Sequence, residues 1–141
     1  MIRELNLNDS SDIEELSRVS LGYDTNIELI KSQILKLNSN PDHIIMGYEL
    51  DKRIVGFVQA QIYECIYFEK GLNILGLAVL PKYQGKGIGK ELMTFLEDKA
   101  VKLGCKFIRL NSAEYRKDAH LFYEKIGYKC DKLQKRFIKI F

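Results

Sequence analysis

A glycine-rich segment at residues 80–93, LPKYQGKGIGKELM, restricts what the surrounding chain can form. The run before it, LNILGLAVL, is apolar almost throughout, which predicts a strand covered on both faces and ended by Pro81. From Ile88 onward, apolar residues recur at the spacing of an amphipathic helix. The segment is therefore expected to be a strand, a loop and a helix. The loop contains three glycines, Gly85, Gly87 and Gly89.

Such a loop suits a phosphate group. A helix begins with backbone N–H groups that have no partner inside the helix, and its N-terminus carries partial positive charge. Glycines let an anion approach these donors, and three lysines add charge. A P-loop is excluded, because Gln84 replaces its first glycine and Glu91 its hydroxyl residue. The spacing G-x-G-x-G also differs from a dinucleotide-binding fingerprint. A purely structural glycine turn remains the alternative.

Composition narrows the class of protein. The chain has 141 residues and a net charge of +3, too small to indicate nucleic-acid binding. No apolar run is long enough for a membrane helix, and the polar start MIRELNLNDSSD lacks a signal-peptide core, so we expect a cytoplasmic protein. Three scattered cysteines and two histidines predict reduced thiols and no metal site.

The pattern along the chain predicts one mixed α/β domain over residues 1–141. Helical periodicity covers residues 13–19, 27–37, 88–103 and 118–126. Strands are expected at 2–6, 43–50, 53–63, 72–80 and 106–112, with two more within 128–141. No repeat or linker interrupts this order.

Three stretches together carry a family resemblance. QGKGIG at 84–89 matches the [Q/R]-x-x-G-x-[G/A] acetyl-CoA loop of the GNAT superfamily of N-acetyltransferases. LGLAVLPKY resembles the family's fourth strand, and residues 110–129, LNSAEYRKDAHLFYEKIGYK, resemble its fifth strand and following helix. The resemblance implies a central mixed sheet of about six to seven strands, flanked by about four helices, with the fourth and fifth strands splayed apart.

The resemblance also implies an acetyl-CoA site and no metal. The backbone of the fourth strand would pair with the pantetheine arm, the loop amides would hold the pyrophosphate, and Asn111 would bond the pantetheine. Phe122 would lie near the thioester or serve as core. The strand residues implied are Leu77, Ala78 and Val79. The loop residues implied are Gln84, Gly85, Lys86, Gly87, Ile88, Gly89 and Lys90.

Tyr123 matches the tyrosine that family members often use as general acid. A phenol with a pKa of about 10 can protonate a thiolate whose conjugate acid has a pKa of about 8.5. Packing is the alternative role for this tyrosine. The fourth strand lacks the carboxylate that many members use as base, so Glu64 is the first candidate and Glu114 the second; Glu64 is alternatively a surface charge.

Two further positions lie at or within the predicted fourth helix. Arg116 stands where many family members carry Asn. His120 lines the cofactor cleft or faces solvent.

The implied reaction is direct transfer of an acetyl group from acetyl-CoA to an amine of a small molecule or peptide. An acyl-cysteine route ranks lower, because no histidine lies near a cysteine in the sequence. Asp24 and Glu28, in and after the stretch LGYDTN, suggest a cationic acceptor. A CoA-binding regulatory or interaction domain without turnover is the alternative. We expect a monomer or homodimer that binds neither nucleic acid nor membrane.

Overall fold

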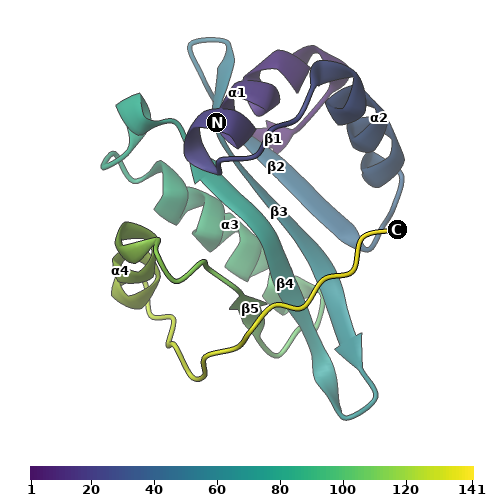
Figure 1. Ribbon diagram of the computed structural model, residues 1–141, viewed down its shortest axis with the longest axis vertical. Helices are drawn as coiled ribbons and strands as arrows, with labels where there is room; N and C mark the ends of the chain where they lie inside the picture. Colours follow the sequence, from purple (N-terminus) through teal and green to yellow (C-terminus); the bar gives the residue numbers. More distant parts are fainter. The chain divides into compact units, whose positions relative to one another are not determined.

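The computed structural model describes residues 1–141, which divide into two compact units, Met1–Leu110 and Asn111–Phe141. The first unit contains one sheet in the order β1-β2-β3-β4-β5 (Figure 1). Neighbours from β1 to β4 are antiparallel, and β5 lies parallel to β4. The strands are β1 (Ile2–Glu4), β2 (His43–Leu50), β3 (Arg53–Cys65), β4 (Phe68–Val79) and β5 (Ile108–Leu110).

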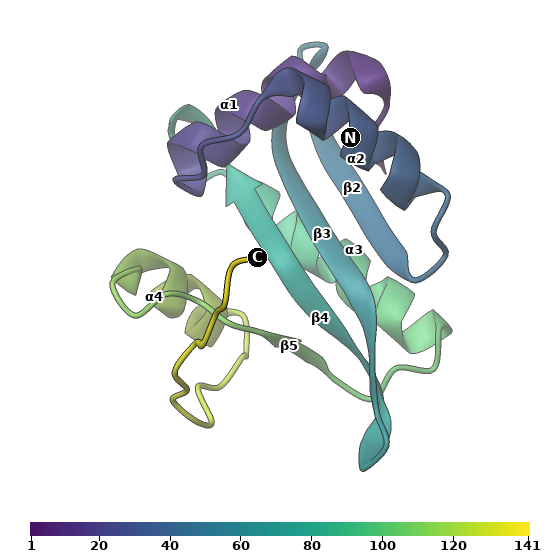
Figure 2. The same cartoon turned by 45° about the vertical axis from the view of Figure 1, so that its right-hand side comes forward.

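Helices cover both faces of this sheet, as the near-continuous apolarity of the fourth strand predicts. Figure 2 shows α1 (Ser10–Ser20) and α2 (Ile27–Asn38) in front of the sheet and α3 (Ile88–Lys102) behind it. The Asn26 side chain caps α2 by accepting a hydrogen bond from the Leu29 N–H at 2.9 Å. One buried core, beneath α1 and α2, consists of Leu5, Ile13, Leu16, Ile30, Ile34, Ile54, Phe57, Ala78 and Leu80.

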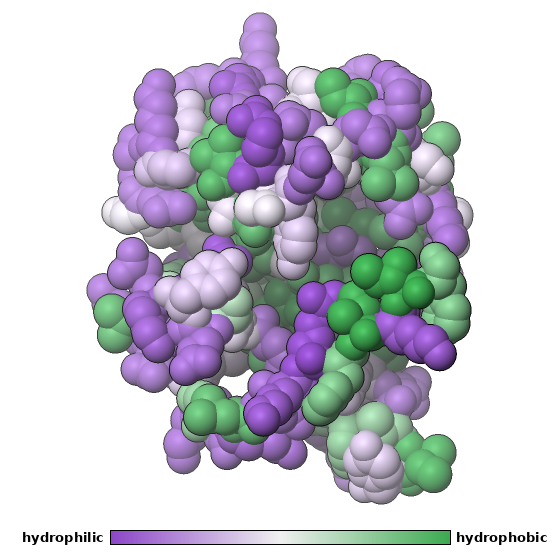
Figure 3. All heavy atoms as spheres, in the orientation of Figure 1, coloured by the Kyte–Doolittle hydropathy of each residue, from purple (hydrophilic) through white to green (hydrophobic).

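The sheet contains two hairpins, and the structure agrees with the sequence prediction better for the first than for the second. Asp51 and Lys52 form the expected tight turn, both with positive φ. The β3–β4 hairpin is longer than expected, because β4 begins at Phe68 rather than at residue 72. Its exposed tip carries Ile66 and Tyr67, and apolar side chains are visible at the lower end of the molecule in Figure 3.

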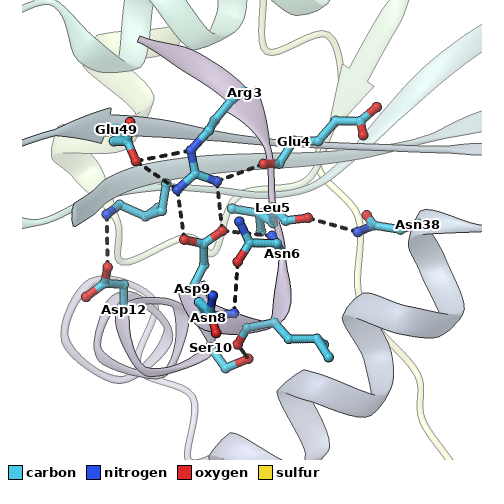
Figure 4. A network of polar contacts seen from close by, with 12 residues as sticks. Arg3, Glu4, Leu5, Asn6, Asn8, Asp9, Ser10, Asp12, Asn38 and Glu49 are labelled. Carbon is cyan, nitrogen blue, oxygen red and sulfur yellow. Dashed lines mark hydrogen bonds and ion pairs between the residues drawn. The ribbon is translucent and has the colours of Figure 1, made fainter. Parts of the chain in front are cut away.

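A polar network fixes the start of the chain to the sheet (Figure 4). The Arg3 guanidinium donates to both carboxylate oxygens of Asp9 at 2.9 Å and to Glu49 at 3.0 Å. The Asn6 N–H donates to Asp9 at 2.8 Å, and the Asn6 side chain accepts from the Asn8 N–H. Burial is the largest influence on the pKa of Asp9 and raises it, but the hydrogen bonds from Arg3 and from the Asn6 N–H, together with the charge of Arg3, outweigh burial and lower the pKa of this carboxyl.

The second unit contains one helix, α4 (Lys117–Lys125), followed by a turn at Gly127 with a φ of +99°. Residues 128–141 form no helix or strand, so the two strands expected there are absent and the sheet has five strands. The alternating apolar residues of this tail, such as Phe137 and Ile140, are exposed. An alternating apolar sequence forms a half-buried strand only where a neighbouring strand supplies backbone hydrogen bonds. The local sequence pattern does not show whether such a neighbour exists.

Candidate functional site

The loop between β4 and α3 reaches the helix through two left-handed glycines. It starts with a single 3-10 turn, Pro81–Tyr83, and then passes Gly85 with a φ of +77° and Gly87, the N-cap of α3, with a φ of +85°. Side chains rarely adopt these angles. A side chain built at either glycine would meet no atom within 4 Å. The backbone conformation, rather than crowding, requires glycine, and the space beside the loop is open.

The first turn of α3 presents backbone donors. The first hydrogen bond within the helix runs from the Glu91 N–H to the Gly87 carbonyl at 2.9 Å. The amides before it, those of Ile88, Gly89 and Lys90, therefore have no acceptor inside the helix. They make no hydrogen bond elsewhere in the chain. The structure thus places a row of open donors where the sequence predicts an anion site.

Gln84 has a different role from these amides. Its N–H donates to the Pro81 carbonyl at 3.3 Å, and its side-chain Nε2 donates to the Val79 carbonyl at 2.9 Å. The Ser20 hydroxyl donates to the same Val79 carbonyl at 3.0 Å. Gln84 therefore ties the loop to the end of β4, and its own amide donates within the turn; its part in holding a pyrophosphate stays a prediction.

Positive charge gathers beside the loop. The Nζ atoms of Lys82 and Lys86 lie 5.7 and 5.5 Å from the centre of the Tyr83 ring. Tyr83 is half-buried and packs against the core, so a cation–π contact holds both ammonium groups close to the loop. Lys90 is exposed in the first turn of α3. These charges and the helix dipole favour an anion at this end of the helix.

β4 separates from β5 before it reaches the loop. The last pair between the two strands is Ile74–Leu110, whereas β4 continues to Val79 while it pairs only with β3. The expected splaying of the fourth and fifth strands is therefore confirmed. The part of β4 that extends beyond the ladder with β5 includes the three predicted strand residues, Leu77, Ala78 and Val79.

A β-bulge lies at the point where the strands separate. Gly76 pairs with Gln59 and Ile74 pairs with Ala60, so Leu75 has no opposite residue on β3. The extra residue of a bulge is left unpaired in the ladder, and bulges are frequent beside active sites. Gly76, inside an apolar strand, is a sequence signal for this bulge.

Tyr123 and Phe122 lie in α4 of the second unit. Their ring centres are 5.2 Å apart, and the Tyr123 ring is 6.1 Å from that of Tyr128. Burial raises the pKa of Tyr123, and the positive charge of Arg116 opposes this rise. The Tyr123 hydroxyl makes no hydrogen bond within the chain. No buried side-chain oxygen lacks a hydrogen-bond partner, so this hydroxyl reaches solvent.

Glu64 does not lie beside the open part of β4. Glu64 is exposed and lies at the hairpin end of β3, beside the pair Cys65–Phe68. Counting along β3 from Val58, which pairs with Leu77, Glu64 is about 20 Å away at roughly 3.3 Å per residue. In the second unit, Glu114 is exposed.

The other predicted positions in the second unit have plainer surroundings. Asn111 is exposed at the first position of this unit. Nε2 of the half-buried His120 lies 2.9 Å from the Ala113 carbonyl, so the ring closes the turn before α4.

The remaining observations concern the thiols, the possible metal ligands and the lengths of the helices. Cys65 and Cys105 are half-buried, Cys130 is exposed, and none forms a disulfide. No group of three or more His, Cys, Asp or Glu side chains is placed to hold a metal ion. None of the helices has the length and apolarity needed to cross a membrane.

An α/β fold with a splayed strand pair and a donor-lined loop at a helix start is one suited to binding a phosphate-containing co-substrate. Residues 10–128 match the model of the Acetyltransferase (GNAT) family. Because this match covers most of the chain, the protein belongs to the GNAT acetyltransferase family.

Individual relatives cover the chain to different extents. The chain is 40% identical over 57 residues to an aminoalkylphosphonate N-acetyltransferase of Salmonella typhimurium, a match that covers 40% of this chain and 37% of that protein. It is 28% identical over 104 residues to a spermidine N(1)-acetyltransferase of Thermoplasma acidophilum, covering 74% of this chain and 62% of that protein. The matched segments thus span less than two thirds of either relative.

The fold also resembles solved structures along its whole length. A transcriptional regulator from Bacillus halodurans superimposes with a TM-score of 0.87 at 21% identity, covering 99% of each chain. At this identity the similarity shows the fold alone.

Proposed function

We propose that this protein binds acetyl-CoA along β4 and the glycine loop and transfers its acetyl group directly to a primary amine. The observation that carries the proposal is the row of open amides at Ile88, Gly89 and Lys90, next to two lysines and an unobstructed glycine loop. Such a site matches the size and charge of a pyrophosphate. The strand edge that leads to it suits an extended amide-containing chain such as pantetheine.

The pantetheine arm of acetyl-CoA would lie along β4 after Ile74, because no strand pairs there with the edge of β4 that faces β5. The backbone of Leu77, Ala78 and Val79 supplies donors and acceptors for its amides, in the manner of strand addition. Asn111 and Phe122 are further proposed contacts. The reacting carbonyl is proposed to lie beside the bulge at Leu75, because a backbone N–H that leaves the ladder at a bulge can stabilise a developing oxyanion.

The chemistry requires an uncharged amine and a protonated acid. The ammonium form of the amine loses one proton to water, its nitrogen forms a bond to the thioester carbonyl carbon, the carbon–sulfur bond breaks, and the nitrogen releases a second proton to water, so that the product is a neutral amide. A proton from solvent then restores Tyr123 after it has protonated the thiolate. Tyr123 donates its proton to the departing thiolate, and its raised pKa keeps it protonated at neutral pH. Glu64 is not part of this proton path, because it lies at the far end of β3.

The test is a calorimetric titration with acetyl-CoA of the unaltered protein and of Gly87→Glu, which introduces a negative charge at the row of amides. Gly104→Glu is a matched control: Gly104 also has positive φ and open space, but it follows the other end of α3. Binding that is lost in Gly87→Glu and kept in Gly104→Glu supports the proposal. No binding by the unaltered protein, or equal loss in both variants, contradicts it.

A CoA-binding regulator without turnover is the second candidate function. It is favoured by the lack of a carboxylate in the β4 stretch NILGLAV, where a base for the amine is expected. Acetyl-CoA binding without acetylation of any amine would establish this candidate. The same result would exclude the proposed transfer reaction.

The acceptor is proposed to be a small amine. The two relatives are named for different acceptors, aminoalkylphosphonates and spermidine, so their names do not select one. The Glu28 carboxylate is exposed and lies 3.9 Å from the Lys31 Nζ, and Asp24 is also exposed. Neither residue is therefore part of a preformed binding site for a cationic acceptor. A single domain, a monomeric or homodimeric state and a cytoplasmic location remain predictions.

A further inference from the structure

The start of α3 carries a carboxylate of its own. Glu91 lies in the first turn of the helix, directly after the open amides of Ile88, Gly89 and Lys90. The Cα–Cβ bonds of a helix tilt toward its N-terminus, so the Glu91 side chain starts out toward these amides. The amides and the helix dipole attract any anion nearby. A Glu91 carboxylate without another partner would therefore compete with a pyrophosphate for the same donors.

The contact between α3 and the sheet determines the side of the helix on which Glu91 lies. α3 lies behind the sheet in Figure 2. The buried Ile88 packs directly on Gly56 of β3, because a side chain built at Gly56 would come within 3.2 Å of the Ile88 Cγ2. Residues three positions apart are neighbours on one face of a helix, so Glu91 lies on the same side of α3 as Ile88.

Tyr48 on β2 is the residue of the sheet that contacts this carboxylate. It pairs with Gly56 on β3 and with Ile2 on β1, so its backbone is fixed between two strands. The Tyr48 hydroxyl donates a hydrogen bond to the Glu91 carboxylate, and this bond is the main reason why the pKa of Tyr48 is raised.

This hydrogen bond draws the charge of Glu91 away from the proposed path of the co-substrate. The glycine loop continues from the end of β4, whereas Tyr48 belongs to β2, two strands away. At about 4.8 Å per strand, the two strands are roughly 10 Å apart. The carboxylate thus has a donor on the side of α3 that faces β2 and not β4.

We propose that Tyr48 is a positioning residue of the co-substrate site: it holds the Glu91 carboxylate toward β2 and so leaves the amides at the start of α3 to the pyrophosphate of acetyl-CoA. This inference rests on the proposed function. It concerns the affinity for acetyl-CoA, and no step of the transfer reaction uses either residue.

The test is a calorimetric titration with acetyl-CoA of the unaltered protein, Tyr48→Phe, Glu91→Gln and the double variant. Tyr48→Phe keeps the ring and removes the hydroxyl that holds the carboxylate. Its dissociation constant should rise roughly two- to fivefold, the effect of one charge at a helix start. Glu91→Gln should bind at least as tightly as the unaltered protein. The double variant should bind like Glu91→Gln, because no charge is left to compete.

Salt gives a second readout of the same competition. The interaction involves charges at the protein surface, which dissolved ions screen. The dissociation constant of Tyr48→Phe, divided by that of the unaltered protein, should therefore approach one as sodium chloride rises from about 0.05 M to about 0.5 M. A loss of affinity caused by altered packing would not decrease with salt in this way.

Matched controls separate positioning from folding. Tyr23→Phe changes an exposed tyrosine between α1 and α2, and Asp98→Asn removes a charge from an exposed position farther along α3. Both should leave the affinity for acetyl-CoA unchanged. Glu91→Asp keeps the charge but shortens the reach to Tyr48, so it should weaken binding as Tyr48→Phe does. The unfolding midpoint of each variant reports an intact fold, and Glu91→Asp provides the test if Tyr48→Phe does not fold.

Three results would overturn the inference while leaving the proposed function standing. The first is an unchanged affinity for acetyl-CoA in Tyr48→Phe. The second is a loss in Tyr48→Phe that the addition of Glu91→Gln does not reverse, because Tyr48 would then support the helix and not the position of the carboxylate. The third is equal binding by Glu91→Asp and Glu91→Gln. Failure of the unaltered protein to bind acetyl-CoA instead rejects the proposed function, and this inference with it.

Discussion

Tyr123 is the residue on which the proposed chemistry depends most directly. Replacing it with Phe removes the acid and keeps the ring contacts with Phe122 and Tyr128. We expect kcat to fall by about 100-fold, within the range for general acid catalysis, with unchanged affinity for acetyl-CoA. Tyr115→Phe, at an exposed tyrosine of the same unit, should leave kcat unchanged. Steady-state kinetics and calorimetry measure both quantities.

The pH dependence of the reaction rate is a second test of the role of Tyr123. Because burial raises the pKa of Tyr123, its acid form persists above the usual range and is lost only as the pH rises through that higher pKa. Rates should therefore show no decline from Tyr123 ionisation below about pH 10. Unaltered kcat in Tyr123→Phe would remove this residue from the mechanism.

At the scale of single residues, the sequence was most informative where chemistry is local. The order of strand, loop and helix around Gly85 and Gly87 was predicted because local spacing determines it, and the structure adds that both glycines are left-handed. The bulge at Leu75 and the distance of Glu64 from it depend on how β3 and β4 pair. Strand register is set by contacts between segments distant in sequence, so neither was predicted.

At the scale of elements, helices were predicted better than strands. All four helical patterns form helices, because a helix satisfies its hydrogen bonds within one segment. Strands β2 and β3 were predicted from the sequence because a two-residue turn joins them. The C-terminal residues 128–141 show the opposite case: their alternation resembles a strand, yet no neighbouring strand pairs with them.

The cap of α2 provides a prediction at this scale. Asn26→Ala removes the side-chain acceptor of the Leu29 N–H and should lower the free energy of unfolding by about 1 kcal/mol. Asn8→Ala, at an exposed asparagine whose side chain makes no hydrogen bond, is the control. Urea unfolding followed by circular dichroism measures the difference. Equal stability of the two variants would show that the cap contributes nothing.

At the scale of the whole molecule, contacts that stabilise the first unit also hold the end of β4, where the candidate site begins. α1 closes one face of the sheet, and Ser20 at its end bonds the Val79 carbonyl where β4 meets the glycine loop. Arg53, at the start of β3, donates to Asp12 at 3.1 Å and to Glu15 at 2.7 Å, joining α1 to the sheet. The network around Asp9 fixes the segment that leads into α1. Loss of this network should therefore weaken the support of β4.

Asp9→Asn tests that network. At neutral pH the change removes the charge that Arg3 contacts and should lower the free energy of unfolding by about 2–3 kcal/mol, the upper range for hydrogen bonds to a charged group. Because folding lowers the pKa of Asp9, its contribution is complete above the ordinary carboxyl pKa of 3.8 and is lost as the pH falls through the lower folded value.

The difference in the free energy of unfolding between Asp9→Asn and the unaltered protein should therefore be about equally large at pH 7 and pH 5, and smaller at pH 3. Asp98→Asn, at an exposed position on α3 without a hydrogen bond, should show no such trend. Urea unfolding at the three pH values measures it, and acetyl-CoA affinity at pH 7 reports whether β4 is disturbed. A difference that persists undiminished at pH 3 would mean that Asp9 stabilises the fold through packing rather than through its charge.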